Sequence, residues 1–178
     1  KHEVDRILPE MAAMIRLMPE YSFTIVAVPH LSVSLYDHWL TGLPNAEVMI
    51  GNMKKVLSGS EAAVVTSGTA TLETALLGVP QIVVYKGSRF SYQIAKRLIK
   101  VGYISLVNLI MNRPLVPELI QDQCTAQHMA TQLKRILSPE VSAEMRQAYL
   151  SLSELLTSGG GAHSAAKEII TDIGRVKS

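Results

Sequence analysis

Short apolar runs alternate with amphipathic helical patterns along most of the chain, and this alternation restricts the fold more than any other feature. Each run is apolar on nearly every residue, so each strand is expected to be buried on both faces. Strands of this kind, separated by helices, indicate an α/β domain built on a parallel sheet with helices on both faces. The strand patterns cover 22–28, 46–50, 61–66, 81–85 and 103–106, and the helical patterns cover 4–18, 32–41, 52–58, 69–77, 91–101, 125–137, 139–156 and 162–174.

The length fits one ordinary domain followed by a terminal helix. The 178 residues are 48% apolar and 18% charged, which is typical of a packed core and argues against disorder. We expect one domain over residues 1–157 and a C-terminal helix in 158–178, joined by the glycines of "SGGGA" and able to cross to another domain or protomer. The chain opens on Lys1 rather than Met, close to a strong helix, and we interpret it as a fragment of a longer protein.

The stretch "VVTSGTATLETALLGVP" places small residues between an apolar strand and a helix. In a parallel sheet, ligands bind beyond the carboxyl ends of the strands, where such turns gather. The first N–H groups of a helix lack partners within it, and Gly68 lets an anion approach them. The nearby hydroxyls belong to Ser67, Thr69 and Thr71. This predicts a phosphate site, with Glu73 accepting hydrogen bonds from an adjoining sugar. Ordinary helix capping without a ligand is the alternative.

Charge and cysteine content exclude several other functions. A net charge of +2 is too small to indicate nucleic-acid binding. The cations between residues 86 and 100 form either a solvated helix face or a site for phosphate or an anionic surface. Cys124 is the sole cysteine, so no intrachain disulfide can form, and the five histidines show no metal-ligand spacing. We expect no metal site, and no apolar run is long enough to span a membrane.

Four motifs resemble the C-terminal half of the lipid-A-disaccharide synthase family: "SGTATLE", "YQIAKRLIKVGYISLVNLI", "RPLVPELIQ" and "GGGAHSAAKEII". The resemblance implies a Rossmann-like domain of an inverting GT-B glycosyltransferase. The implied donor is a UDP-linked 2,3-diacylglucosamine, and the implied acceptor is 2,3-diacylglucosamine 1-phosphate, joined through its 6-hydroxyl with release of UDP. No cofactor is implied. The family places the catalytic base in an N-terminal domain that this chain lacks, so the catalytic residue is unknown and the chain alone is expected to be inactive.

The same resemblance assigns roles to individual residues. The implied contacts are Ser67, Gly68 and Thr69 with the diphosphate, Glu73 with the ribose, Ile50, Gly51, Asn52 and Met53 with uracil, and Asn108 and Arg113 with substrate or phosphate. The last two are expected to flank a strand end and face the cleft between domains.

The resemblance also suggests location and partners. Both substrates carry acyl chains, so the enzyme is expected in the cytoplasm of a Gram-negative bacterium, peripheral at the inner-membrane face. The C-terminal helix is expected to pair two protomers into a homodimer, and the sheet is expected to be one strand short. An enzyme similar to UDP-N-acetylglucosamine 2-epimerase and a non-catalytic nucleotide-binding module are the alternatives. The epimerase family shows paired acids where this chain has Glu73 followed by Thr74.

Overall fold

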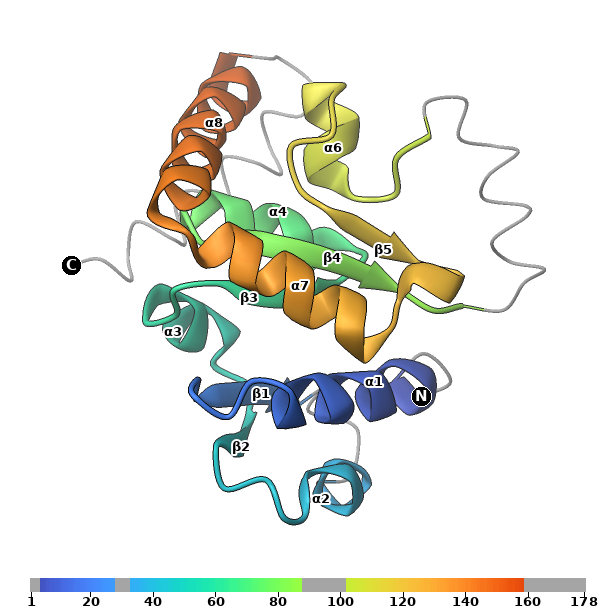
Figure 1. Cartoon of the computed structure of the whole chain (residues 1–178). Coiled ribbons are helices and arrows are strands. Elements are labelled where there is room, and N and C mark those ends of the chain that lie inside the picture. The colour runs from blue at the N-terminus through green and yellow to red at the C-terminus, as the bar shows by residue number, and fades with distance from the viewer. Residues whose placement is uncertain (1–3, 28–32, 88–101, 159–178) are drawn as a thin grey trace.

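The computed structural model describes residues 4–27, 33–87 and 102–158 (Figure 1). The elements are α1 (Val4–Arg16), β1 (Phe23–Ala27), α2 (Ser34–Leu40), β2 (Ala46–Ile50), α3 (Met53–Ser58), β3 (Ala63–Thr66), α4 (Thr69–Leu76), β4 (Gln81–Tyr85), α6 (Leu106–Met111), β5 (Glu118–Ile120), the 3-10 turn η1 (Gln121–Gln123), α7 (Ala126–Leu137) and α8 (Pro139–Ser158). Strands and helices alternate, which confirms the predicted α/β class.

The described strands form two parallel sheets. One sheet holds β1 and β2, with Ile25 opposite Val48. The other has the order β3-β4-β5, with Val65 opposite Val83 and Val84 opposite Leu119. The described residues therefore contribute five strands. The division of these strands into two sheets was not predicted, and the expected missing strand stays a prediction.

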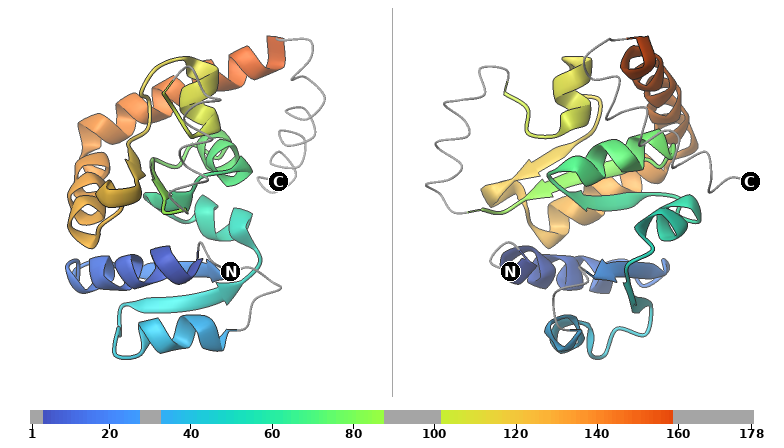
Figure 2. Two further views of the ribbon diagram at one scale, coloured as in Figure 1. Left: turned by 90° about the vertical axis from the view of Figure 1, so that its right-hand side faces the viewer. Right: turned by 180° about the vertical axis from the view of Figure 1, so that it is seen from behind.

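Helices cover both faces of the three-stranded sheet. Figures 1 and 2 show α7 on one face and α4 on the other, and α4 also packs against α6 and α8. The middle strand is the centre of the core, because Ile82, Val83 and Val84 are completely buried. Burial on both faces explains why this run is apolar at successive positions.

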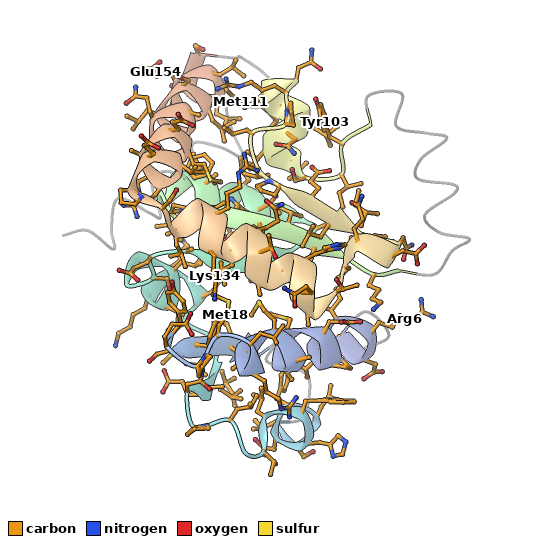
Figure 3. The ribbon with its side chains drawn as sticks, viewed as in Figure 1. Arg6, Met18, Tyr103, Met111, Lys134 and Glu154 are labelled. Atoms are coloured by element: carbon orange, nitrogen blue, oxygen red, sulfur yellow. The ribbon has the colours of Figure 1, made fainter. Side chains whose placement is uncertain are left out.

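Helix α1 links the two sheets through the helices beside it. It packs against α2 and, more extensively, against α7. At its end, Lys134 of α7 lies above Met18 in the view of Figure 3, and the Lys134 Nζ is 3.2 Å from the Glu20 Oε1. The buried side chains of α1 (Ile7, Leu8, Ala12, Met14 and Ile15) recur at helical spacing, as its amphipathic pattern predicts.

One predicted strand is wrong, and three elements, α6, β5 and η1, were missed. Residues 103–106 were expected to be extended as a strand, but 102–105 form a loop and Leu106 begins α6. The hydroxyl of Ser105 caps α6 by accepting from the Asn108 N–H, so a helix begins where the apolar pattern indicated a strand. Strand β5 was also missed because it has only three residues. The predicted helices over 91–101 and 162–174 lie outside the described residues.

Candidate functional site

The turn between β3 and α4 centres on a backbone conformation that only glycine adopts easily. Gly68 has φ +154° and ψ −163° and is the N-cap residue of α4. A Cβ built on Gly68 would meet no atom within 4 Å, so the space above the turn is open. No side chain caps α4. The Thr71 N–H bonds to the Gly68 carbonyl at 3.2 Å, so among the described residues the Thr69 and Ala70 N–H groups are the ones at this helix start that could bind an anion.

The three hydroxyls of this turn do not play the same part. Thr71 is completely buried and its Oγ1 donates to the Gly68 carbonyl at 2.8 Å, so the expectation that Thr71 offers a hydroxyl to a ligand is wrong. The Ser67 Oγ donates to the Ile104 carbonyl at 3.0 Å. Thr69 is exposed. Of the three, Thr69 has the hydroxyl most accessible to a guest, whereas Ser67 ties the turn to the loop at 102–105.

Glu118 holds that loop in place. Its carboxylate accepts from the Ile104 N–H at 3.0 Å, from the Ser105 N–H at 2.9 Å and from the Ser105 Oγ at 2.7 Å. A fourth donor is the Asn108 side-chain amide, at 2.8 Å. The loop in turn carries the carbonyl that Ser67 contacts. Glu118 thus supports the Gly68 turn indirectly. The sequence did not predict this role, because Glu118 lies far from the turn along the chain.

Asn108 lies inside this network rather than beside a strand end. It belongs to α6 and is 1% exposed. Its amide also donates to the Val116 carbonyl at 2.9 Å, and its Oδ1 accepts from the Val116 N–H at 2.9 Å. These bonds use the side chain to close the turn between α6 and β5. The contact with substrate that the resemblance implied at Asn108 stays a prediction, although no polar atom of this side chain is left over for it.

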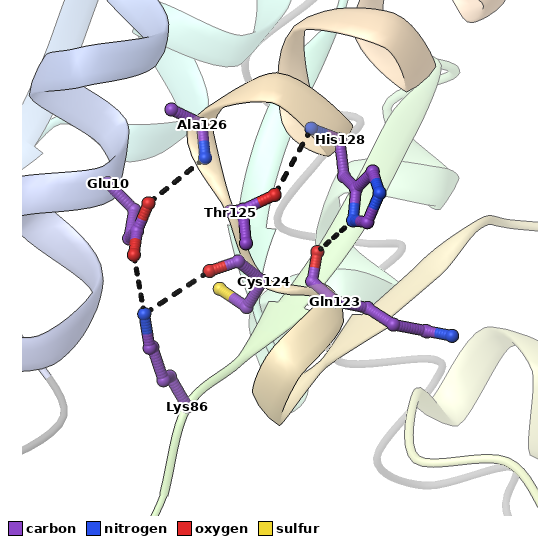
Figure 4. A network of polar contacts seen from close by, with 7 residues as sticks. All are labelled: Glu10, Lys86, Gln123, Cys124, Thr125, Ala126 and His128. Carbon is purple, nitrogen blue, oxygen red and sulfur yellow. Dashed lines mark hydrogen bonds and ion pairs between the residues drawn. The ribbon is translucent and has the colours of Figure 1, made fainter.

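Lys86, at the carboxyl end of β4, is paired within the chain (Figure 4). Its Nζ lies 2.6 Å from the Glu10 Oε1 of α1 and 3.4 Å from the Cys124 carbonyl. The Glu10 Oε2 accepts from the Ala126 N–H at the start of α7, at 3.0 Å. Burial raises the pKa of Glu10, but the bonds from Lys86 and Ala126 outweigh it, so the pKa lies below its ordinary value. This first cation of the basic stretch is therefore engaged, and residues 88–101 lie outside the described residues.

The predicted uracil-binding segment ends the other sheet. Ile50 closes β2 and is 54% exposed. Gly51 and Asn52 both have left-handed backbone conformations, with φ +68° and +53°, and Met53 begins α3. Two consecutive left-handed residues make a sharp turn with exposed peptide groups, suited to contacts through the backbone. The described contacts do not join this segment to the Gly68 turn.

Arg113 and Gly68 lie near opposite ends of the strands of the three-stranded sheet. It is exposed and follows α6, before β5 begins, whereas Gly68 follows the end of β3. Because these strands are parallel, Arg113 lies toward the amino ends of the strands and Gly68 lies toward their carboxyl ends. Arg113 instead borders a groove of about 790 Å³, which is also lined by residues of α7 and α8 such as Arg135 and Met145. A phosphate contact at Arg113 remains a prediction that this placement does not support.

Comparison with known proteins identifies relatives over most of the chain. A family profile described as Lipid-A-disaccharide synthetase matches residues 3–171. A lipid-A-disaccharide synthase of Syntrophus aciditrophicus is 34% identical over 178 residues, which cover 96% of this chain and 46% of the relative. Those of Anaeromyxobacter dehalogenans and Geobacter metallireducens are 35% and 32% identical over 83% and 97% of this chain. The chain spans about half or less of the length of each of these relatives.

Proposed function

This chain belongs to the lipid-A-disaccharide synthetase family, and we propose that it forms the nucleotide-sugar-binding part of an inverting glycosyltransferase of lipid A biosynthesis. The observation that carries the proposal is the Gly68 turn at the carboxyl end of a parallel strand, where no side chain caps α4 and a Cβ on Gly68 would meet no atom within 4 Å. A diphosphate matches this turn because backbone N–H groups and the helix dipole attract an anion.

The proposed reaction moves 2,3-diacylglucosamine from UDP to the 6-hydroxyl of 2,3-diacylglucosamine 1-phosphate. The 6-hydroxyl loses its proton to a general base, its oxygen bonds to the sugar's anomeric carbon, and the bond to the diphosphate oxygen breaks. UDP leaves as an anion. This chain's part is to bind UDP and to stabilise the charge that develops on the departing diphosphate. The base is assigned to another part of the protein.

Each proposed contact uses a different kind of group. The N–H groups at the start of α4 and the Thr69 hydroxyl take the diphosphate. Ser67 acts mainly by holding the 102–105 loop against the turn. Glu73 is partly exposed on α4, and its carboxylate has no hydrogen bond within the described residues, which leaves it available for the ribose hydroxyls. The peptide groups of residues 50–53 take uracil.

The setting of the reaction is part of the same proposal. Both substrates are lipids, so the enzyme works on the cytoplasmic face of the inner membrane. In the described part of the chain, no helix has the length and apolar character needed to cross a bilayer. We further propose that residues 1–157 form the UDP-binding domain and that the helix predicted from the sequence in 158–178 crosses to another domain or to a second protomer to form a homodimer.

Calorimetric titration with UDP tests the site directly. Replacing Glu73 with Gln removes a charged acceptor from the ribose and should weaken binding by about 1–3 kcal/mol, or roughly 5- to 150-fold in Kd. Glu61→Gln is the matched control, because Glu61 is exposed and precedes β3, so it lies at the end of the strand away from the Gly68 turn. Equal UDP affinity in the Glu73→Gln variant and the parent protein would contradict the assignment. Turnover of free UDP sugars without a lipid acceptor would favour the epimerase instead.

A further inference from the structure

A completely buried glutamine contacts the helix that follows the Gly68 turn. Gln81 opens β4, and the three residues after it are apolar and completely buried. Glutamine is usually exposed, because burying its amide costs free energy unless each polar atom finds a partner. Gln81 meets this condition only in part. Its Nε2 donates to the Thr71 carbonyl at 2.8 Å, whereas its Oε1 is buried without a hydrogen-bond partner among the described residues.

The bond from Gln81 is not needed to satisfy Thr71. Thr71 lies in α4, and a carbonyl inside an α-helix already accepts from the N–H group four residues further along. An apolar side chain of similar length at position 81 would remove the unpaired Oε1 and leave no lone group on Thr71. Gln81 is therefore expected to lower the stability of the fold rather than raise it. Proteins keep such costly groups mainly where function uses them.

Thr71 connects Gln81 to the Gly68 turn. The N–H and the Oγ1 of Thr71 both donate to the Gly68 carbonyl, at 3.2 and 2.8 Å. The Thr71 carbonyl is held by Gln81, whose backbone is fixed opposite Ala63 in the pairing of β3 with β4. The Gly68 carbonyl and the Thr69 N–H belong to one planar peptide group and point in opposite directions. Whatever holds that carbonyl therefore also sets the direction of the Thr69 N–H.

We propose that Gln81 is a positioning residue for the diphosphate: through Thr71 it fixes the Gly68 peptide group and so aims the Thr69 N–H at the bound anion. This role rests on the proposed function, because the diphosphate is the ligand assigned to the turn. Gln81 itself is completely buried and touches no part of that ligand. The turn is then held by two separate contacts, one from Gln81 through α4 and one from the 102–105 loop through Ser67.

Tyr149 of α8 supplies a matched control at the same place. It is 2% exposed, and α8 packs against α4. Burial raises the pKa of the Tyr149 phenol, and the polar groups of Gln81 beside it lower the pKa in part. No hydrogen bond of ordinary geometry joins the hydroxyl to a described residue. Tyr149→Phe therefore removes a buried polar group next to Gln81 without cutting the connection from Gln81 to Gly68.

Calorimetric titration of the complete gene product with UDP and with uridine tests this role. Gln81→Met keeps the length of the side chain and removes the donor to Thr71. The Kd for UDP should rise ~5-fold, which corresponds to about one hydrogen bond. The Kd for uridine, which lacks the diphosphate, should change by less than about 2-fold. The melting temperature should stay within about 3 °C of the parent protein or rise above it. Tyr149→Phe should leave both Kd values unchanged.

Three results would contradict the role of Gln81. The first is an unchanged UDP affinity in Gln81→Met. The second is an equal loss of UDP and uridine affinity, or a melting temperature lowered by ~10 °C, because either would indicate a general structural role. The third is a Tyr149→Phe variant that loses as much UDP affinity as Gln81→Met, because the connection to Gly68 would then not be the cause.

Amide hydrogen exchange without ligand, followed by NMR, separates this role from the proposed function. The Thr71 N–H, which bonds to the Gly68 carbonyl, should exchange ~5-fold faster in Gln81→Met than in the parent protein. The Val83 N–H bonds to the Pro117 carbonyl at 2.8 Å and is the internal reference, so its exchange should not change. Unchanged exchange at Thr71 would overturn positioning by Gln81 even where UDP binds. A parent protein that does not bind UDP, with Thr71 responding as expected, would instead contradict the proposed function and the diphosphate as ligand, while supporting the connection from Gln81 to the turn.

Discussion

Replacing Glu118 with Gln should loosen the loop beside the Gly68 turn. The carboxylate accepts four hydrogen bonds from residues 104, 105 and 108, at distances between 2.7 and 3.0 Å. Glutamine has nearly the same shape, but one of its two terminal groups donates rather than accepts. The variant thus keeps the volume of the side chain but replaces one of its two acceptor oxygens with a donor group.

The cost follows from the number of donors left without an acceptor. Three of the four donors bond to Oε1 and only the Ile104 N–H bonds to Oε2, so a glutamine oxygen in the Oε1 position keeps three donors and leaves the Ile104 N–H facing an NH₂ group. Each part-buried donor that loses its acceptor costs about 1–3 kcal/mol. Because one donor loses its acceptor and solvent reaches part of the network, we expect a total of about 1–3 kcal/mol.

Urea unfolding followed by circular dichroism measures this loss, since the transition midpoint shifts while its slope stays constant. Glu144→Gln is the matched control, because Glu144 is exposed on α8 and the same substitution there should change the unfolding free energy by less than about 0.5 kcal/mol. UDP binding should weaken in Glu118→Gln as well, through the Ser67 contact. A Glu118→Gln protein as stable as the control would show that the network does not hold the loop.

Two further predictions concern pH and assembly. The pKa of Glu10 is lowered in the folded state, so its ion pair with Lys86 stabilises the fold above the ordinary value of 4.5, and this stability is lost as pH falls through the folded value. Glu10→Gln should flatten that part of the pH dependence in urea unfolding series, and an unchanged slope would contradict the pairing. If residues 158–178 join two protomers, their deletion should convert a dimer into a monomer in light scattering. The same mass with and without the segment would contradict the proposed dimer.

Local sequence patterns were enough to predict most of the described elements. Four apolar runs became the strands β1 to β4, and α4 ends two residues before Gly78, whose φ of +75° suits the turn after a helix C-terminus. The pattern failed over 103–106, where tertiary bonds determine the structure. There the carboxylate of Glu118 binds two backbone N–H groups that a strand would need for its ladder. No window of local sequence contains both partners.

In the candidate site, too, the features formed by neighbouring residues were predicted, whereas the contacts between residues far apart in the sequence were not. The glycine turn was predictable because strand, small residues and helix are contiguous in the chain. The partner of Ser67 lies 37 residues away and that of Lys86 lies 76 residues away. Sequence alone therefore placed both groups among the candidates for phosphate binding. The fold instead uses the Ser67 hydroxyl as a donor inside the chain and neutralises Lys86 with Glu10.

Among the described residues near the Gly68 turn, the groups available to a ligand are chiefly backbone groups, and this limits what kind of site the turn can form. Ser67, Thr71 and Asn108 all donate within the chain, so little of the anion attraction can come from their side chains. Within the described residues we expect the attraction to come mainly from the N–H groups at the start of α4, which follow the unusual conformation of Gly68. A site of this kind is sensitive to whatever holds the turn in place. Glu118, which touches no part of the proposed ligand, is for that reason expected to affect UDP binding as well as stability.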